Sequence, residues 1–362
     1  MILLQLPLLQ VLAATPALPP AEVELVWAPE PGIALHRSYQ TRHLLAAELQ
    51  SMQALSALDR RTGGEGQRSL SQKRFELTVT QSLRVSDRLL ARDDERPTSL
   101  RRFFEHGGFK ADMETDDPTG VTRTRRLQGK SSFENKSVVF TWVPEDQEYG
   151  RYFDAQEGPE EILPGLELDL SMSSLLPEGP VALGAQWSLP PAVLGEVLSL
   201  GGRRDVSLSN ERGEAVFRTM RVGVGYDVFQ LFGEREEGEV AARLIGLEES
   251  EAGHQLALID LDFDVLAERE MRGLANSDLN AFDVMRGVKV ESALVKVTLK
   301  GKGVVIWDAT GNHLHEVRDL KADEQVSTHL QRTFGQGDEE VLEIQDLVMV
   351  GTLLHSVKVT EN

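Results

Sequence analysis

The chain has 362 residues, of which 41% are hydrophobic and 27% are charged, and this composition excludes a low-complexity or wholly disordered polypeptide. Its 58 acidic and 38 basic residues give a formal net charge of −20, a field that repels phosphate backbones, so nucleic acid is not an expected partner. The absence of cysteine excludes disulfides, thiolate metal sites, cysteine nucleophiles and iron–sulfur clusters.

The amino terminus has the residue order of a secretory signal. An apolar run over residues 1–14 is followed by Ala17 and a cluster of prolines, and the run is too short to span a bilayer. No Lys or Arg precedes it, so a buried strand or helix is the alternative interpretation. We expect a signal-like segment at 1–20, a Pro-rich spacer at 21–32, and an exported protein in the periplasm or outside the cell.

From residue 33 onward, apolar and polar residues alternate with period two, which predicts half-buried β-strands. Residues 41–58 fit either a helix or a strand, and pairing with the next strand favours the strand. The predicted strands lie at 75–85, 131–143, 216–232, 255–267, 288–307 and 341–359.

Short polar turns between these runs contain Gly and Asn, which predicts hairpins and antiparallel pairing. The turns are expected at 209–213, 234–238, 249–253, 308–312 and 335–338. Pro190 and Pro191 before residues 192–200, with Gly201 and Gly202 after them, predict one short helix.

The predicted fold is therefore mainly β, a large antiparallel meander that forms a curved sheet or an open barrel-like sheet, with one or two short helices. We expect an N-terminal β half at 33–153, a crossover of loops and short helix at 154–202, and a C-terminal β half at 203–362. The two halves form either separate units or one continuous domain over 33–362.

Two motifs resemble binding sites but lack residues that such sites require. Gly129-Lys130-Ser131 lacks the earlier glycine and the following helix of a phosphate-binding loop. Asp260, Asp262 and Asp264 share one strand face, but an EF-hand loop would need other residues after them, so a solvated face is expected.

Two histidines have the spacing of zinc ligands on one strand. His313 and His315 project from the same face, but spacing identifies no third ligand, so we interpret them as exposed strand histidines. We predict no metal, no cofactor and no catalytic residue.

Long antiparallel strands in an exported protein also raise the question of a membrane barrel. Only 6% of residues are aromatic, and charges interrupt both faces of the strands at Lys296, Lys300, Asp260, Glu343 and Asp346, so we do not expect an integral membrane protein. Arginines between residues 84 and 126 either form surface ion pairs or face anionic lipid or glycan, and ion pairs are favoured.

Several blocks of the chain have the residues of a known type of protein. They are residues 129–142 (GKSSFENKSVVFTW), residues 145–149, Leu175-Leu176-Pro177 with Val181, Gly184 and Trp187, and residues 299–308 with Gly311. In these blocks the chain resembles exported β-rich proteins of environmental bacteria, a domain-of-unknown-function type of family. The resemblance implies export and a large β sheet, and it implies no activity and no site residues.

The sequence favours a non-enzymatic protein of the periplasm or cell envelope. It predicts a concave sheet face, not fully filled by its own side chains, that binds lipid or another apolar ligand through Phe140, Trp142, Val295, Val297 and Trp307. An envelope protein is the other expected partner.

A hydrolase acting on envelope lipid or glycan is the alternative from another class. Its catalytic residues would come from distant strands, with His254, His313 or His355 as the titratable group.

Overall fold

The computed structural model describes residues 22–70, 75–93, 96–116, 121–155, 158, 160–166, 168, 172–198, 206–211, 232, 234–277, 279, 284–335 and 340–361. The signal-like segment, and the predicted strand 216–232 apart from its last residue, lie outside these ranges.

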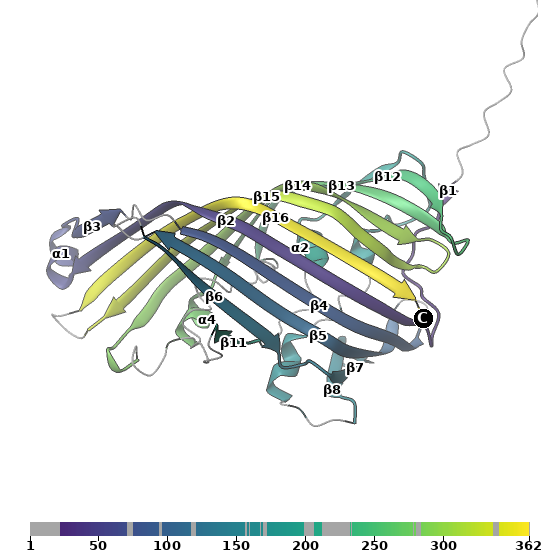
Figure 1. The fold of residues 1–362 in the computed structure, drawn as a ribbon, viewed down its shortest axis with the longest axis horizontal. Helices are drawn as coiled ribbons and strands as arrows, with labels where there is room; N and C mark the ends of the chain where they lie inside the picture. Colours follow the sequence, from purple (N-terminus) through teal and green to yellow (C-terminus); the bar gives the residue numbers. More distant parts are fainter. Residues whose placement is uncertain are drawn as a thin grey trace, which may run out of the picture.

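A 14-stranded antiparallel sheet dominates the molecule and confirms the predicted fold class (Figure 1). Its main path runs β10-β12-β13-β14-β15-β16-β2-β4-β5-β6-β11, with β3 beside β2 and the hairpin of β7 and β8 beside β5. The strands are β2 (Ala34–Ser56), β3 (Gln67–Leu70), β4 (Phe75–Arg92), β5 (Pro97–Asp116), β6 (Thr122–Ser131), β7 (Lys136–Val143), β8 (Glu148–Phe153), β10 (Gln186–Leu189), β11 (Val206–Asn210), β12 (Arg235–Glu249), β13 (Gln255–Glu270), β14 (Lys289–Asp308), β15 (His313–Phe334) and β16 (Val341–Glu361).

The two β halves share this sheet. The last long strand, β16, pairs with the first, β2, from Val341 opposite Ser56 to Glu361 opposite Leu35. The seam between the halves therefore lies in the middle of the sheet rather than at a domain boundary (Figure 1).

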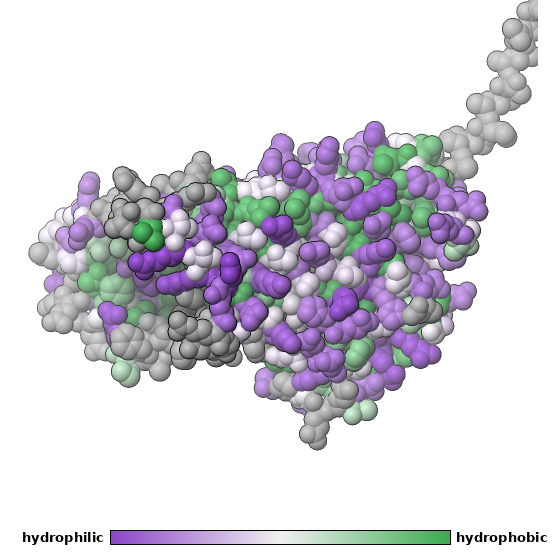
Figure 2. All heavy atoms as spheres, in the orientation of Figure 1, coloured by the Kyte–Doolittle hydropathy of each residue, from purple (hydrophilic) through white to green (hydrophobic). Residues whose placement is uncertain are grey.

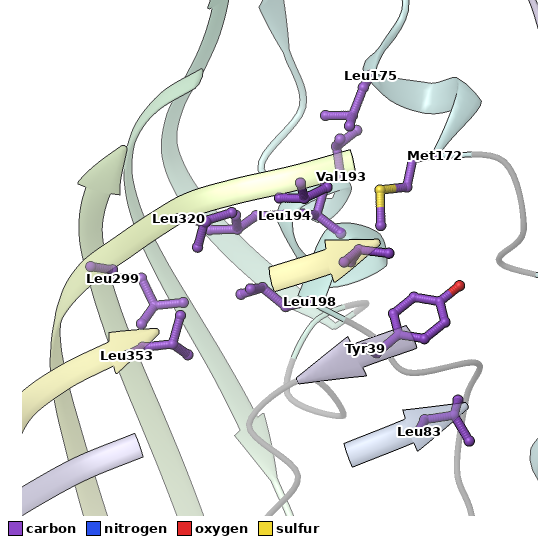
Figure 3. Close-up of a cluster of buried hydrophobic side chains, with 14 of the residues drawn as sticks. Tyr39, Leu83, Met172, Leu175, Val193, Leu194, Leu198, Leu299, Leu320 and Leu353 are labelled. Atoms are coloured by element: carbon purple, nitrogen blue, oxygen red, sulfur yellow. The ribbon is translucent and has the colours of Figure 1, made fainter. Parts of the chain in front are cut away.

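Each long strand has two chemically different faces because its side chains alternate. The inner face carries Tyr39, Leu83, Leu299, Leu320 and Leu353, all buried, and surrounds the helix α2 (Figure 3). The outer face carries the alternate residues of the same strands.

Helix α2 (Ala192–Leu198) confirms the helix predicted from Pro190 and Pro191 and fills the hollow of the sheet. Seven residues form no stable helix alone, so packing must hold it. Val193, Leu194, Val197 and Leu198 are all buried in one apolar cluster with the inner face (Figure 3).

Smaller elements complete the fold. They are α1 (Ala57–Thr62), which Ser56 caps directly after β2, α4 (Arg272–Ser277), and the 3₁₀ turns η1 (Glu160–Gly165) and η2 (Ser173–Leu175). None of the helices in the described ranges has the length and apolar character needed to cross a bilayer.

The structure corrects two expectations. The predicted spacer begins with β1 (Glu22–Val23), which pairs with β9 (Val181–Ala182), and Leu25 is buried because apolar residues of this segment pack on the core. The predicted turn 234–238 is wrong, since Arg235–Gly238 is the start of β12 and pairs with the charged end of β13.

Candidate ligand-binding face

The five residues predicted to bind an apolar ligand do not lie together. Phe140 on β7 and Val295, Val297 and Trp307 on β14 are at most 1% exposed, so protein atoms cover them. Trp142 lies apart, in an edge-on contact with Tyr149, and the Arg96 guanidinium is 4.3 Å from its ring centre.

The structure instead brings four polar side chains together on the inner face. Thr41 and His43 come from β2, Glu324 from β15 and His355 from β16, and all four are at most 3% exposed. The Nδ1 atom of His43 lies 2.9 and 3.0 Å from the two carboxylate oxygens of Glu324. The Thr41 hydroxyl and the Nδ1 atom of His355 are 2.9 Å apart. We call these four residues the inner polar cluster.

Strand register explains how the inner polar cluster forms. Thr41 lies directly opposite His355, whereas the residue opposite Glu324 on β16 is Gly351. A Cβ atom at Gly351 would collide with the backbone oxygen of Leu44, so the strands approach closely there. Because Gly351 has no side chain, His43 can reach past β16 to Glu324.

Burial under α2 determines the protonation of His355. Burial, with a smaller contribution from His43, lowers the pKa of His355 to about 3, although the carbonyl of Val197 in α2 favours the charged form. His355 is therefore neutral near pH 7. Its Nε2 atom has no hydrogen-bond partner of normal geometry within the described ranges.

The inner polar cluster stabilises the core less than apolar side chains of similar size would. Burying polar groups costs free energy unless each one is fully hydrogen-bonded, and replacing a buried ion pair with apolar side chains is often neutral or stabilising. Leu320 and Leu353, which lie opposite His355 and His43, show that leucine packs well there. The cluster provides polar anchoring groups within an apolar surface, which is the composition of small-molecule sites.

A second buried group of charges lies further along the inner face. The Nε atom of Arg102 is 2.8 Å from an Asp87 oxygen, and Arg37 approaches the other oxygen at 3.6 Å. The expectation that the arginines of residues 84–126 form surface pairs is wrong for Arg102, which is 1% exposed. It is correct for Arg101, which pairs with Asp154 at 2.8 Å.

The predicted histidines belong to two different places. His254 and Asp308 are 2.7 Å apart, and Asp308 also accepts backbone hydrogen bonds from Thr310 and Gly311. The hydrogen bond and charge of Asp308 raise the pKa of His254. This pair joins the β12–β13 turn to the end of β14, whereas His355 belongs to the inner polar cluster.

The two weak metal candidates do not share a ligand geometry. His313 is buried, contrary to the expectation of an exposed histidine, and its Nδ1–H donates to the carbonyl of Leu314 at 2.8 Å. Its Nε2 atom lies 3.6 Å from Glu361, and His315 is half-exposed. No three His, Asp or Glu side chains in the described part of the chain are placed to hold a metal ion.

A serine, a histidine and a glutamate form a chain of contacts on the outer face. The Ser82 hydroxyl is 3.4 Å from Nε2 of His106, and Nδ1 of His106 is 3.3 Å from Glu134. A Cβ atom at Gly108 would lie 2.8 Å from both the serine oxygen and the imidazole, so glycine is needed for their approach.

The sequence did not reveal the inner polar cluster or the buried group of Arg102 and Asp87, because the members of each come from separate strands and form no local motif. The available signal was the alternation of buried and exposed positions along each strand. His43 alternates in step with the buried Tyr39 and Leu45, and Arg102 alternates in step with Leu100 and Phe104.

The chain matches no protein-family model and no curated protein. Its similarity to exported β-rich bacterial proteins therefore remains a prediction.

Proposed function

We propose that this is an exported, non-enzymatic protein of the periplasm or cell envelope that binds an amphiphilic ligand, an apolar chain with one polar group, on the inner face of the sheet. The observation that carries the proposal is the inner polar cluster, buried in an apolar surface. Exported position is supported by the signal-like residue order of segment 1–20.

Helix α2 occupies the place that the ligand's apolar chain would take. Val193, Leu194 and Leu198 cover the inner face through side-chain packing (Figure 3), and apolar contacts of this kind are exchangeable for those of a lipid chain. A helix of seven residues has little stability of its own, so α2 is held by this packing, which the apolar chain of a ligand would replace.

The inner polar cluster would receive the polar group of the ligand. The Nε2 atom of His355 lacks a hydrogen-bond partner of normal geometry in the described ranges, and a ligand hydroxyl or carboxyl group would supply one. A single such bond contributes on the order of 1 kcal/mol, and more if the ligand group is charged. The remaining affinity would come from the apolar chain.

Native mass spectrometry of protein purified from its host's envelope fraction tests the proposal. We expect a mass excess that disappears after organic extraction, and binding of a pyrene-labelled fatty acid by the extracted protein. His355→Leu should weaken binding of that probe about fivefold to tenfold. Leu353→Met, a volume-conserving control on the same strand face, should change it little. A bare protein mass together with no probe binding would overturn the proposal.

The contact chain of Ser82, His106 and Glu134 favours a second candidate, a hydrolase acting on envelope lipid or glycan. Its connectivity is that of nucleophile, base and orienting acid, in which the histidine removes the serine proton through Nε2.

A fluorophosphonate probe distinguishes the two candidates. If Ser82 is a nucleophile, the probe labels the protein and Ser82→Ala abolishes labelling. Ser86→Ala is the control, because Ser86 lies four residues further along the same face of β4. Absence of labelling would exclude a reactive Ser82 and leave the binding proposal intact.

A further inference from the structure

A row of cationic side chains crosses the middle of the outer face. Lys302 on β14 lies opposite Lys321 on β15, and Arg42 on β2 and Lys110 on β5 follow in the same row. Leu354 on β16 and Thr80 on β4 occupy the positions between them. We call the four exposed cations the outer basic row.

The outer basic row is unfavourable for the isolated protein. Like charges directly opposite each other on neighbouring strands destabilise a sheet, as Lys302 and Lys321 do here. The chain has 58 acidic residues with which to neutralise the row. Within the described ranges, however, no ion pair involves any of its four cations.

Two neighbouring lysines on β14, in contrast, do form ion pairs. Lys300, two residues before Lys302, pairs with Asp264 at 2.7 Å, and Lys296 pairs with Glu268. Acidic residues do flank the row, since Asp262 lies opposite Lys302 and Asp323 lies two residues after Lys321. Within the described ranges the cations of the row thus form no ion pair, although carboxylates flank them.

Apolar side chains accompany the row. Leu354, between Lys321 and Arg42, is 36% exposed, and Val350 on the same face of β16 is 37% exposed. Figure 2 shows hydrophilic residues across the molecule with hydrophobic residues between them. Cations with exposed apolar side chains between them match an anionic bilayer, which offers charged headgroups above apolar chains, better than an anionic glycan, which offers charge and hydroxyl groups but no apolar chain.

We infer that the outer basic row, with Leu354 and Val350, binds the surface of an anionic phospholipid bilayer. The net charge of −20 does not prevent this contact, because salt screens charges beyond a Debye length of about 8 Å. The contact is peripheral, and it goes beyond the proposed ligand binding and does not depend on it.

Vesicle co-sedimentation tests this inference with the full chain. Vesicles of phosphatidylcholine with phosphatidylglycerol should bind the protein at about 150 mM salt, and vesicles of phosphatidylcholine alone should bind it at least tenfold more weakly. Raising the salt to 500 mM should remove most of the binding, because the attraction is electrostatic.

Charge reversal identifies the surface. Lys321→Glu with Arg42→Glu should lower partitioning to anionic vesicles at least tenfold. Lys289→Glu with Arg235→Glu makes the same change in net charge at exposed cations away from the row and should lower it less than threefold. Circular dichroism and the Tm of both variants establish that they fold.

Three outcomes would overturn the inference: no binding of the wild-type protein to anionic vesicles, equal losses in the two double variants, or binding to heparin without binding to vesicles. The last outcome would indicate a glycan instead. Bound cargo is measured separately by native mass spectrometry, so failure of the proposed function and failure of this inference are distinguishable.

Discussion

The two faces of the sheet differ in whether their charged side chains all have partners. On the inner face, Asp87 and Glu324 each lie against a cationic or imidazole partner, and all of these groups are almost fully buried. On the outer face, Lys321 and Arg42 lie exposed and have no ion pair within the described ranges. Water solvates an unpaired charge, whereas a protein interior does not. Ion pairs on the inner face are therefore required for stability. Unpaired cations on the outer face cost little and are available to a partner.

The largest expected effect comes from breaking a buried pair on the inner face. Asp87→Asn leaves Arg102 and Arg37 buried without their shared counter-charge, and such losses cost about 3–5 kcal/mol of unfolding free energy. Asp264→Asn on the outer face removes the partner of Lys300 and should cost far less, because both side chains are exposed and water screens their attraction. Urea denaturation measures both, and similar losses in the two variants would contradict the contrast between the faces.

Apolar side chains should show the same contrast with a somewhat smaller effect. Leu194→Ala in α2 removes a side chain that is 1% exposed and should lower the unfolding free energy by about 2–5 kcal/mol. Leu354→Ala on the outer face should change it by about 0.5 kcal/mol or less. Equal stability of Leu194→Ala and the wild type would show that α2 is not packed as a core element.

Protonation of the inner polar cluster gives a pH-dependent effect. The lowered pKa of His355, about 3 against a usual value of 6.5, means that the unfolded chain binds a proton more readily than the folded one. The stability contribution of neutral His355 is therefore lost as pH falls from 6.5 toward 3, by about 1.4 kcal/mol per pH unit.

His355→Gln tests this linkage because glutamine does not titrate. The variant should be less stable than the wild type at pH 7, and its unfolding free energy should fall less steeply between pH 6.5 and 4. Urea denaturation at several pH values measures the slopes. Parallel slopes would mean that His355 is not the group that titrates.

Local sequence signals predicted most of the secondary structure. Alternation predicted β4, β13, β14 and β16, and the proline and glycine residues around residues 192–200 predicted α2. The turn at 234–238 failed because a polar run with a glycine resembles a turn, while in the fold Arg235 pairs with Glu268 across to β13 at 3.3 Å. Pairing with a distant strand outweighed local composition.

The inner polar cluster could be predicted only in part. Phase along β2 places His43 on the buried face, but its partner Glu324 lies 281 residues further along the chain. Only the pairing of β2 with β16, and of β16 with β15, brings the two strands into reach. The apolar character of residues such as Trp307 correctly predicted that they are buried. It did not indicate whether a ligand or the protein itself covers them.

The smallest expected effect concerns His254, and its pH dependence has the opposite sign to that of His355. Asp308 raises the pKa of His254, mainly through their hydrogen bond, so this pair stabilises the fold below the usual histidine pKa of 6.5 and its contribution is lost as pH rises through the raised value.

The side chain of His254 is 34% exposed, so solvent screening limits the effect of His254→Gln to about 0.3–1 kcal/mol at pH 5.5, shrinking toward pH 9. Urea denaturation of this variant at both pH values measures the difference. A buried imidazole is destabilised by acid and a paired imidazole near the surface is destabilised by base, so the same residue type should report which environment it occupies. Loss of stability in His254→Gln that is equal at the two pH values would show that this contact depends on packing of the ring rather than on its charge.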